Sequence, residues 1–164
     1  MKHRAREAAL NRLEAFVGEW RVDASFPGSP PGRSVFEWTL GGQYLIQRST
    51  VPPPAPASLA VVSVDPETGA YTQHYFDSRG VTRVYAMTLS RGTWSLTRES
   101  PDFSPLDFNQ RFIGKFSKDG RIIKGSWETS KKRGAPWMKD FDLVFTRVGS
   151  GPSAPTPRKR PPRS

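Results

Sequence analysis

The stretch Phe16-Val17-Gly18-Glu19-Trp20 marks the point where the chain changes from a helical to a strand-forming pattern. Before it, small and apolar residues recur every three or four positions over residues 5–16, which predicts a short helix. Gly18 ends that helix, and apolar and polar residues alternate from Trp20 to Phe26, as in a half-buried strand. The stretch therefore predicts a β structure that begins directly after an N-terminal helix.

Strand patterns continue from Trp20 towards the C-terminus, and turn residues separate them. The expected strands cover residues 20–26, 34–40, 44–50, 59–64, 71–76, 81–89, 93–98, 108–116, 122–129 and 137–147. Most connections are short, and Gly41-Gly42 and Lys118-Asp119-Gly120 have the composition of hairpin turns. No helical pattern long enough for a parallel crossover lies between the strands, so we expect an antiparallel sheet in chain order.

These strand patterns predict an all-β fold: an up-and-down antiparallel β-barrel of about ten strands, with the short N-terminal helix plugging one end. A barrel is favoured because closure removes the exposed edges that an open sheet of this size would leave. A β-sandwich is the competing architecture. A barrel of about ten strands encloses more space than its own side chains fill, so a central cavity is expected.

Cationic residues are concentrated at the two ends of the 164-residue chain, whose net charge is +10. Residues 1–12 form a basic segment of net charge +3 that leads into the helix, residues 13–148 form the barrel with +3, and residues 149–164 carry +4. The last segment is rich in Gly, Ser, Pro and basic residues, which predicts a disordered, solubilising tail rather than a binding surface. Because the barrel carries little excess charge, we do not expect nucleic acid as a partner.

The composition also excludes several kinds of chemistry. The chain contains no Cys, so disulfides, thiol catalysis and Cys-based metal sites are excluded. The acidic residues show no metal-ligand spacing, and we expect neither a metal nor a cofactor. The N-terminus lacks the apolar core of a signal peptide, and no apolar run is long enough to insert into a membrane. A cytoplasmic location is therefore the expectation.

Gly18-Glu19-Trp20 resembles the Gly-x-Trp signature at the start of the first strand in lipocalins and other calycins, where a short helix also precedes it. In that superfamily an Arg near the end of the last strand packs on this Trp. The resemblance assigns this part to Arg147, which would also donate hydrogen bonds to the backbone of the plugging segment. Gly18, Trp20 and Arg147 are thus expected to close one end of the barrel.

Other segments resemble a bacterial domain-of-unknown-function family of calycin-like barrels. The similar segments are residues 40–45, 64–69, 74–80 and 139–141, and the likeness covers roughly residues 10–147. The family resemblance implies a fold and not an activity. The related nitrobindins bind haem through a His on a late strand, but this chain has no His after His74, so the resemblance does not extend to haem.

Polar side chains on strand faces are the candidates for ligand contact. His74 is the only His inside the predicted barrel and shares a strand face with Thr72 and Phe76. It would either contact a ligand in the cavity or, as we prefer, form a structural hydrogen bond in the wall. Arg98 and Gln110 share faces with large apolar residues, so we expect them inside, where Arg98 would hold a carboxylate.

Aromatic residues are expected mainly in the core, with some forming a wall on which a ligand stacks. The aromatic candidates for ligand contact are Trp38, Trp94 and Tyr85. Other polar residues that would line the cavity if they point inward are Gln47, Arg83 and Arg111. We expect no catalytic residue, because no catalytic motif is present.

Three functions are compatible with these features. The preferred one is a barrel that binds a small hydrophobic or amphipathic molecule in its cavity. The second is a cofactor-free isomerase or cyclase, in which His74 or a cavity residue such as Tyr75 or Tyr85 moves a proton. The third is a structural or interaction protein, for example a homodimer formed through an apolar outer patch.

Overall fold

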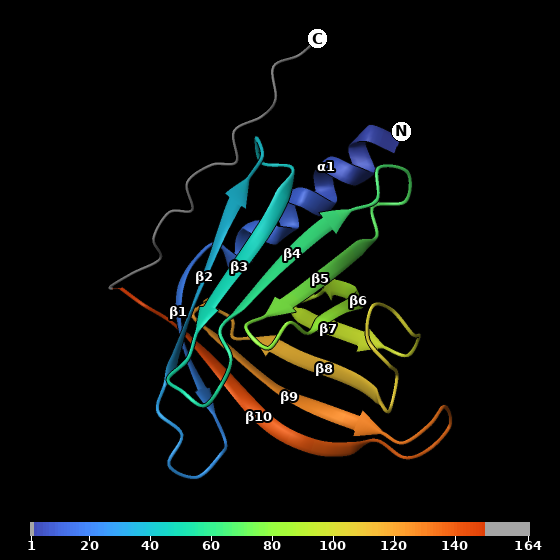
Figure 1. The fold of residues 1–164 in the computed structure, drawn as a ribbon. Helices are drawn as coiled ribbons and strands as arrows, with labels where there is room; N and C mark the ends of the chain where they lie inside the picture. Colours follow the sequence, from blue (N-terminus) through green and yellow to red (C-terminus); the bar gives the residue numbers. More distant parts are fainter. Residues whose placement is uncertain (1, 150–164) are drawn as a thin grey trace.

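The ten strand patterns form ten strands that close into one barrel in the computed structural model, which describes residues 2–149 (Figure 1). The strands are β1 (Gly18–Ala24), β2 (Gly32–Thr39), β3 (Tyr44–Thr50), β4 (Ser58–Val64), β5 (Tyr71–Asp77), β6 (Thr82–Ser90), β7 (Thr93–Arg98), β8 (Asn109–Phe116), β9 (Ile122–Ser130) and β10 (Met138–Arg147). Each pairs antiparallel with its neighbour in the chain, and β10 pairs with β1. The predicted up-and-down barrel is confirmed, and the sandwich is excluded.

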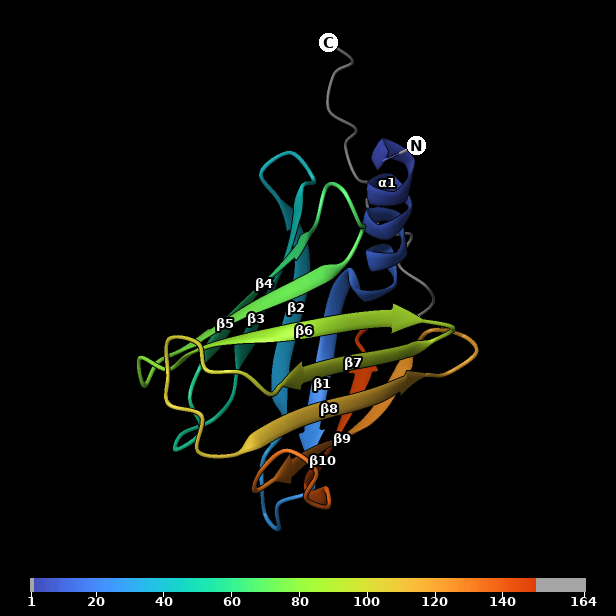
Figure 2. The same cartoon turned by 90° about the vertical axis from the view of Figure 1, so that its right-hand side faces the viewer.

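Two helical segments precede the barrel: the α-helix α1 (Lys2–Arg12) and the 3-10 helix η1 (Leu13–Phe16). The α-helix begins earlier than the expected residue 5, and the last turn before the barrel is tighter than an α-helix. Figures 1 and 2 show α1 standing at one end of the barrel, where its C-terminal part meets the strands. Leu10, Leu13 and Phe16 are at most 1% exposed, so these segments plug that end as predicted.

Aromatic rings form the contact between the plug and the barrel. Phe16 stacks on Phe36 with ring centroids 5.2 Å apart, and it meets Trp94 and Phe116 edge-on at 4.9 and 5.2 Å. These three partners come from β2, β7 and β8, so one side chain of η1 contacts strands on different sides of the barrel. The end near η1 is therefore filled with packed rings.

The expected contact between Trp20 and Arg147 is present at the same end. The two residues are paired across β1 and β10, and the guanidinium carbon of Arg147 lies 4.2 Å from the centre of the Trp20 ring. Arg147 also donates hydrogen bonds to the backbone oxygens of Val17 (2.5 Å) and Ala15 (2.7 Å). The Trp20 indole donates to the oxygen of Phe16 at 2.8 Å, so the first and last strands both hold the plug.

Gly18 gives the chain its change of direction between η1 and β1. Its φ angle is 127°, a conformation that L side chains rarely adopt, so a glycine is required there. The next inward position, Trp20, is 0% exposed. The local geometry thus explains why the strand pattern starts directly after a glycine.

A pair of glycines makes a recess in the barrel wall for the ring of Phe112. Gly114 on β8 lies directly opposite Gly125 on β9. A Cβ added to Gly125 would lie 2.6 Å from Cε2 of Phe112, and one added to Gly114 would lie 2.8 Å from Cε1 of the same ring. Because these positions carry no side chains, the ring lies against the wall instead of filling the interior.

The predicted disordered tail, residues 149–164, lies outside the described residues except for Gly149. Among the described residues, no helix has the length and apolar character needed to cross a bilayer.

Candidate ligand-binding site

A cavity of about 550 Å³ occupies the half of the barrel away from the plug. Trp94, which packs against Phe16 of the plug, forms part of its floor. At the other end the lining includes exposed residues of the loops 25–31 and 51–57, such as Ser29 and Pro52, so the cavity reaches solvent between these loops. Its volume lies within the range of about 300–1,000 Å³ that is typical of small-molecule sites.

One side of the cavity is aromatic and apolar. The strands β7 to β10 and β1 contribute only apolar side chains to the lining. Its aromatic members are Trp94, Phe112, Trp127, Phe141 and Phe145. Phe112 lies 5.3 Å from Trp127 and 4.9 Å from Trp94, measured between ring centroids, so the rings form one continuous surface. A flat apolar molecule would find a stacking surface there.

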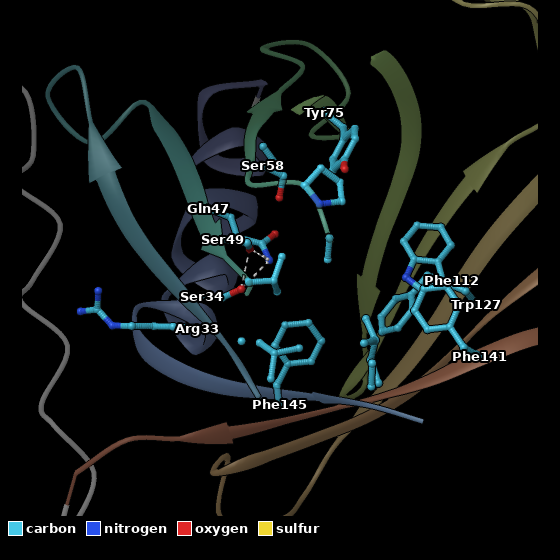
Figure 3. A pocket seen from close by; sticks show the side chains of 18 of the residues that line it. Arg33, Ser34, Gln47, Ser49, Ser58, Tyr75, Phe112, Trp127, Phe141 and Phe145 are labelled. Atoms are coloured by element: carbon cyan, nitrogen blue, oxygen red, sulfur yellow. Dashed lines mark hydrogen bonds between the residues drawn. The ribbon is translucent and has the colours of Figure 1, made fainter. Parts of the chain in front are cut away.

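The opposite side of the cavity is polar and comes from β2 to β5. The hydroxyl oxygens of Ser34 and Ser49 lie 2.6 Å apart, and Nε2 of Gln47 donates to them at 3.3 and 3.4 Å. Ser58 on β4 continues this polar surface. Figure 3 shows these side chains facing the rings of Phe112 and Trp127 across the cavity.

Gln73 and Tyr75 on β5 complete the polar side. Gln73 is 4% exposed and lines the cavity, yet its amide makes no hydrogen bond with any described residue. The Tyr75 hydroxyl donates to Oδ2 of Asp77 at 3.0 Å. Burial, followed by this hydrogen bond, raises the pKa of Tyr75 to about 12, so its hydroxyl stays protonated at neutral pH.

The two charged residues that line the cavity are both paired near its rim. Arg33 donates to Glu19 at 2.5 Å on the outside of β2, and Figure 3 shows its side chain directed away from the cavity. Arg79 donates to Asp77 at 2.7 Å. Burial tends to raise the pKa of Asp77, but hydrogen bonds from Arg79, Tyr75 and the backbone outweigh it and lower this pKa to about 2. The lining thus presents no unpaired charge.

Arg98 points into the barrel as expected, but its charge is already neutralised. It is 2% exposed and donates from Nε and Nη2 to the carboxylate of Asp102 at 2.8 and 2.9 Å. It also donates to the backbone oxygens of Ser104 and Pro105. The loop 99–108 therefore folds over Arg98, which is not among the cavity-lining residues, and the predicted carboxylate contact is not supported.

Gln110 and Tyr85 also point inward but do not line the cavity. Oε1 of Gln110 accepts hydrogen bonds from the Tyr85 hydroxyl at 2.9 Å and from Arg83 at 3.3 Å. Burial raises the pKa of Tyr85, so this hydroxyl also remains a donor. These residues, together with Arg98, form a polar cluster beside the cavity, under the loop 99–108.

The prediction that His74 contacts a ligand inside the barrel is wrong. The inward face of β5 carries Gln73 and Tyr75, and His74 lies on the opposite face with Phe76, which is 39% exposed. The alternation of side chains along a strand forbids both sets from facing the cavity. Without an inward His74, the isomerase interpretation loses its main candidate group.

Two other predicted residues lie away from the cavity. Trp38 points inward beside the plug, where its indole donates to Oε1 of Glu14 at 2.9 Å. Arg111 lies on the outer face, paired with Glu128 at 3.2 Å and stacked on Trp137 at 4.3 Å. Of the candidates predicted from the sequence, the cavity is lined by Trp94, Gln47 and Tyr75. The indole N–H of Trp94 is buried and has no hydrogen-bond acceptor within residues 2–149.

On the polar side of the cavity, Gln47 and Tyr75 were predicted from the sequence, but the serines and Gln73 were not. Ser34 shares a strand face with Phe36, and Gln73 shares one with Tyr71. That alternation is a usable signal, because a small or amide side chain between two buried apolar residues of a strand points inward with them.

Comparison of the chain with models of known protein families and with curated proteins finds no match. Within residues 2–149, no group of three or more acidic or His side chains is arranged to hold a metal ion. Any functional conclusion therefore rests on the geometry of the cavity.

Proposed function

We propose that this protein binds a small, largely apolar molecule in the open half of its barrel. The observation that carries the proposal is the cavity of about 550 Å³, which has Trp94 in its floor. All side chains that line one side of this cavity are apolar. A water-filled space of this size against five aromatic rings is unfavourable, and an apolar ligand would remove their surface from water.

The likeness to calycin-like barrels supports the proposal without deciding it. The Gly18-Glu19-Trp20 signature and its contact with Arg147 have the arrangement that this resemblance implies. We therefore propose that the chain is a calycin-like barrel, a class whose members commonly enclose small molecules. The fold alone does not determine function, so the cavity carries the argument.

Binding of the neutral fluorescent probe N-phenyl-1-naphthylamine tests this function. Its fluorescence is expected to rise when it is titrated with the full chain and to saturate at one site. Ala60 is 4% exposed and lines the cavity, so Ala60→Phe would fill the space that the probe needs. We expect this variant to lower the affinity for the probe by at least about tenfold, a loss of about 1.4 kcal/mol.

Ala86→Phe is the matched control, because Ala86 lies on the outer face of β6 and is exposed. This variant should bind the probe as the wild type does. Circular dichroism would check that both variants keep the β-barrel. Equal binding by the wild type and by a folded Ala60→Phe variant would place the probe outside the cavity and contradict the proposal.

A further inference from the structure

The polar side of the cavity presents amide groups that are available to a ligand. Gln73 is 4% exposed, lines the cavity and has no hydrogen-bond partner among the described residues. A buried primary amide has two N–H donors and a carbonyl acceptor, and leaving them unpaired is unfavourable. This side chain is therefore prepared to pair with a group that offers both a donor and an acceptor.

Gln47 presents a second amide with a fixed orientation. Its Nε2 donates to the hydroxyls of Ser34 and Ser49, which are themselves hydrogen-bonded to each other. This network leaves the carbonyl oxygen of Gln47 turned towards the cavity, where no described side chain donates to it (Figure 3). The register of β3, β4 and β5 places Gln47 and Gln73 on the same inner surface, with Ala60 and Val62 between them.

The charges around the cavity argue against an anionic ligand. Arg33 and Arg79, the two cationic residues of the lining, are paired with Glu19 and Asp77. Arg98 is paired with Asp102 and lies off the cavity. A carboxylate among Ser, Gln and aromatic side chains would lose its hydration without gaining a counter-charge.

From these observations we propose that the ligand is an uncharged, planar aromatic molecule with an amide-like edge, one donor beside one acceptor. The edge would pair with the amides of Gln73 and Gln47, and the ring system would stack against Phe112 and Trp127. Glutamine amides recognise such edges through paired hydrogen bonds, as they do on adenine. This inference rests on the proposed function, because it requires the ligand to occupy the cavity.

Three compounds that share one ring system distinguish a ligand with an amide edge from an anionic ligand and from a purely apolar one. Naphthalene-2-carboxamide carries the amide edge, naphthalene-2-carboxylate carries a negative charge, and 2-ethylnaphthalene carries neither. Each is titrated into the full chain and followed by isothermal titration calorimetry. The carboxamide is expected to bind at least about tenfold more tightly than the carboxylate, because the charge is buried without a partner.

The variant Gln73→Met removes the amide and keeps the size of the side chain. It is expected to weaken binding of the carboxamide by about tenfold, the effect of two lost hydrogen bonds, and to change binding of 2-ethylnaphthalene by less than about twofold. Gln43→Met is the matched control, since Gln43 lies in the turn between β2 and β3 at the plugged end. It should leave all three affinities unchanged.

The outcomes distinguish this inference from the function on which it rests. If the naphthylamine probe binds but the carboxylate matches or exceeds the carboxamide, the ligand class is wrong and the binding function stands. The ligand class is also wrong if Gln73→Met weakens all three compounds equally, or if none of them binds while the probe does. If neither the probe nor any of the three compounds binds, both proposals fail.

Discussion

At the scale of single residues, Trp20 connects the plug to the first and last strands. Its ring is fully buried, its N–H donates to Phe16, and Arg147 covers its face. We expect Trp20→Ala to lower the free energy of unfolding by about 4 kcal/mol, because it removes a large buried ring and leaves a cavity. Urea titration monitored by circular dichroism measures this change.

Trp137→Ala is the matched control for that substitution. Trp137 also stacks with an arginine, Arg111, but it lies on the outside of the barrel and is only half-buried. A cation–π pair in such a position contributes about 1 kcal/mol or less. Similar losses of stability in the two variants would show that the plugged end is not held by Trp20.

Asp102 is a second residue whose contribution to stability can be tested by substitution. Asp102→Asn would leave the buried guanidinium of Arg98 without its counter-charge, so we expect a loss of about 3 kcal/mol in unfolding free energy at pH 7. Hydrogen bonds from Arg98 are the main reason that the pKa of Asp102 lies well below its usual range. The measurement is urea unfolding of both proteins at several pH values.

The pH dependence of this difference has a definite sign. In the unfolded chain Asp102 has a pKa near its ordinary value of about 4, whereas the folded state holds its pKa lower. The stabilisation is therefore complete above about pH 4 and is lost as the pH falls towards the folded-state pKa. The difference in unfolding free energy between wild type and Asp102→Asn should narrow steadily below pH 4. The control Asp140→Asn, at an exposed position, should have the same unfolding free energy as the wild type.

The residue scale also shows where sequence reasoning fails. The pairing of Trp20 with Arg147 could be anticipated, because each has a definite position relative to the first and last strands. The neutralisation of Arg98 could not, because it depends on the path of the loop 99–108, which no periodic pattern describes. A strand pattern shows which residues share a face, and the loops decide what those residues meet.

At the scale of elements, the paired glycines Gly114 on β8 and Gly125 on β9 leave the space that the Phe112 ring occupies. Gly125→Ala would place a methyl group against the Phe112 ring and push this ring towards the cavity. We expect the substitution to lower the free energy of unfolding by about 2 kcal/mol, as overpacking does, and to weaken probe binding. Urea titration and probe fluorescence measure the two effects.

A second substitution tests the cause of that effect. Phe112→Leu shortens the side chain, so the double variant Gly125→Ala/Phe112→Leu should lose less stability than the two single variants lose together. Strictly additive losses of stability would mean that the backbone conformation, and not the packing of the Phe112 ring, requires glycine at these positions. The sequence gives no sign of this match, because Gly114, Gly125 and Phe112 meet only once the register of β8 and β9 is set.

The positions of all ten strands follow from the alternation of residues and from the turn signals between them. The helix was less predictable at its start, because Lys2 and Arg4 are charged and the residues before Ala5 form no apolar stripe. Its contact with β4 and the hydrogen bond from Tyr71 on β5 to the oxygen of Ala9, at 2.5 Å, depend on tertiary packing. The apolar pattern of a sequence predicts a helix or strand well when the apolar face of that element is regular.

At the scale of the whole molecule, the barrel divides into a filled half and an open half. The closed sheet with its N-terminal plug could be predicted, because ten antiparallel strands leave few alternatives to closure. The division of the cavity into a polar and an aromatic side could not, because it depends on which strands lie opposite each other in the closed barrel. The alternation within one strand shows which of its residues point inward, but it does not show what they face across the cavity.

The same division links ligand binding to the stability of the fold. A molecule that binds only the folded barrel stabilises it by about 2.7 kcal/mol when its free concentration is 100 times its dissociation constant. The naphthylamine probe should therefore raise the melting temperature of the wild type. It should raise that of Ala60→Phe by much less at the same probe concentration, because the filled cavity binds the probe more weakly.

The plug fills one end of the barrel, and the cavity opens to solvent between the loops 25–31 and 51–57. We expect a ligand to enter and leave between these two loops, at the end of the barrel opposite the plug. A change in these loops that the bound molecule does not touch must then speed or slow arrival and departure by the same factor. Substitutions at the opening can thus change the residence time of the ligand while the fraction of occupied barrels stays the same.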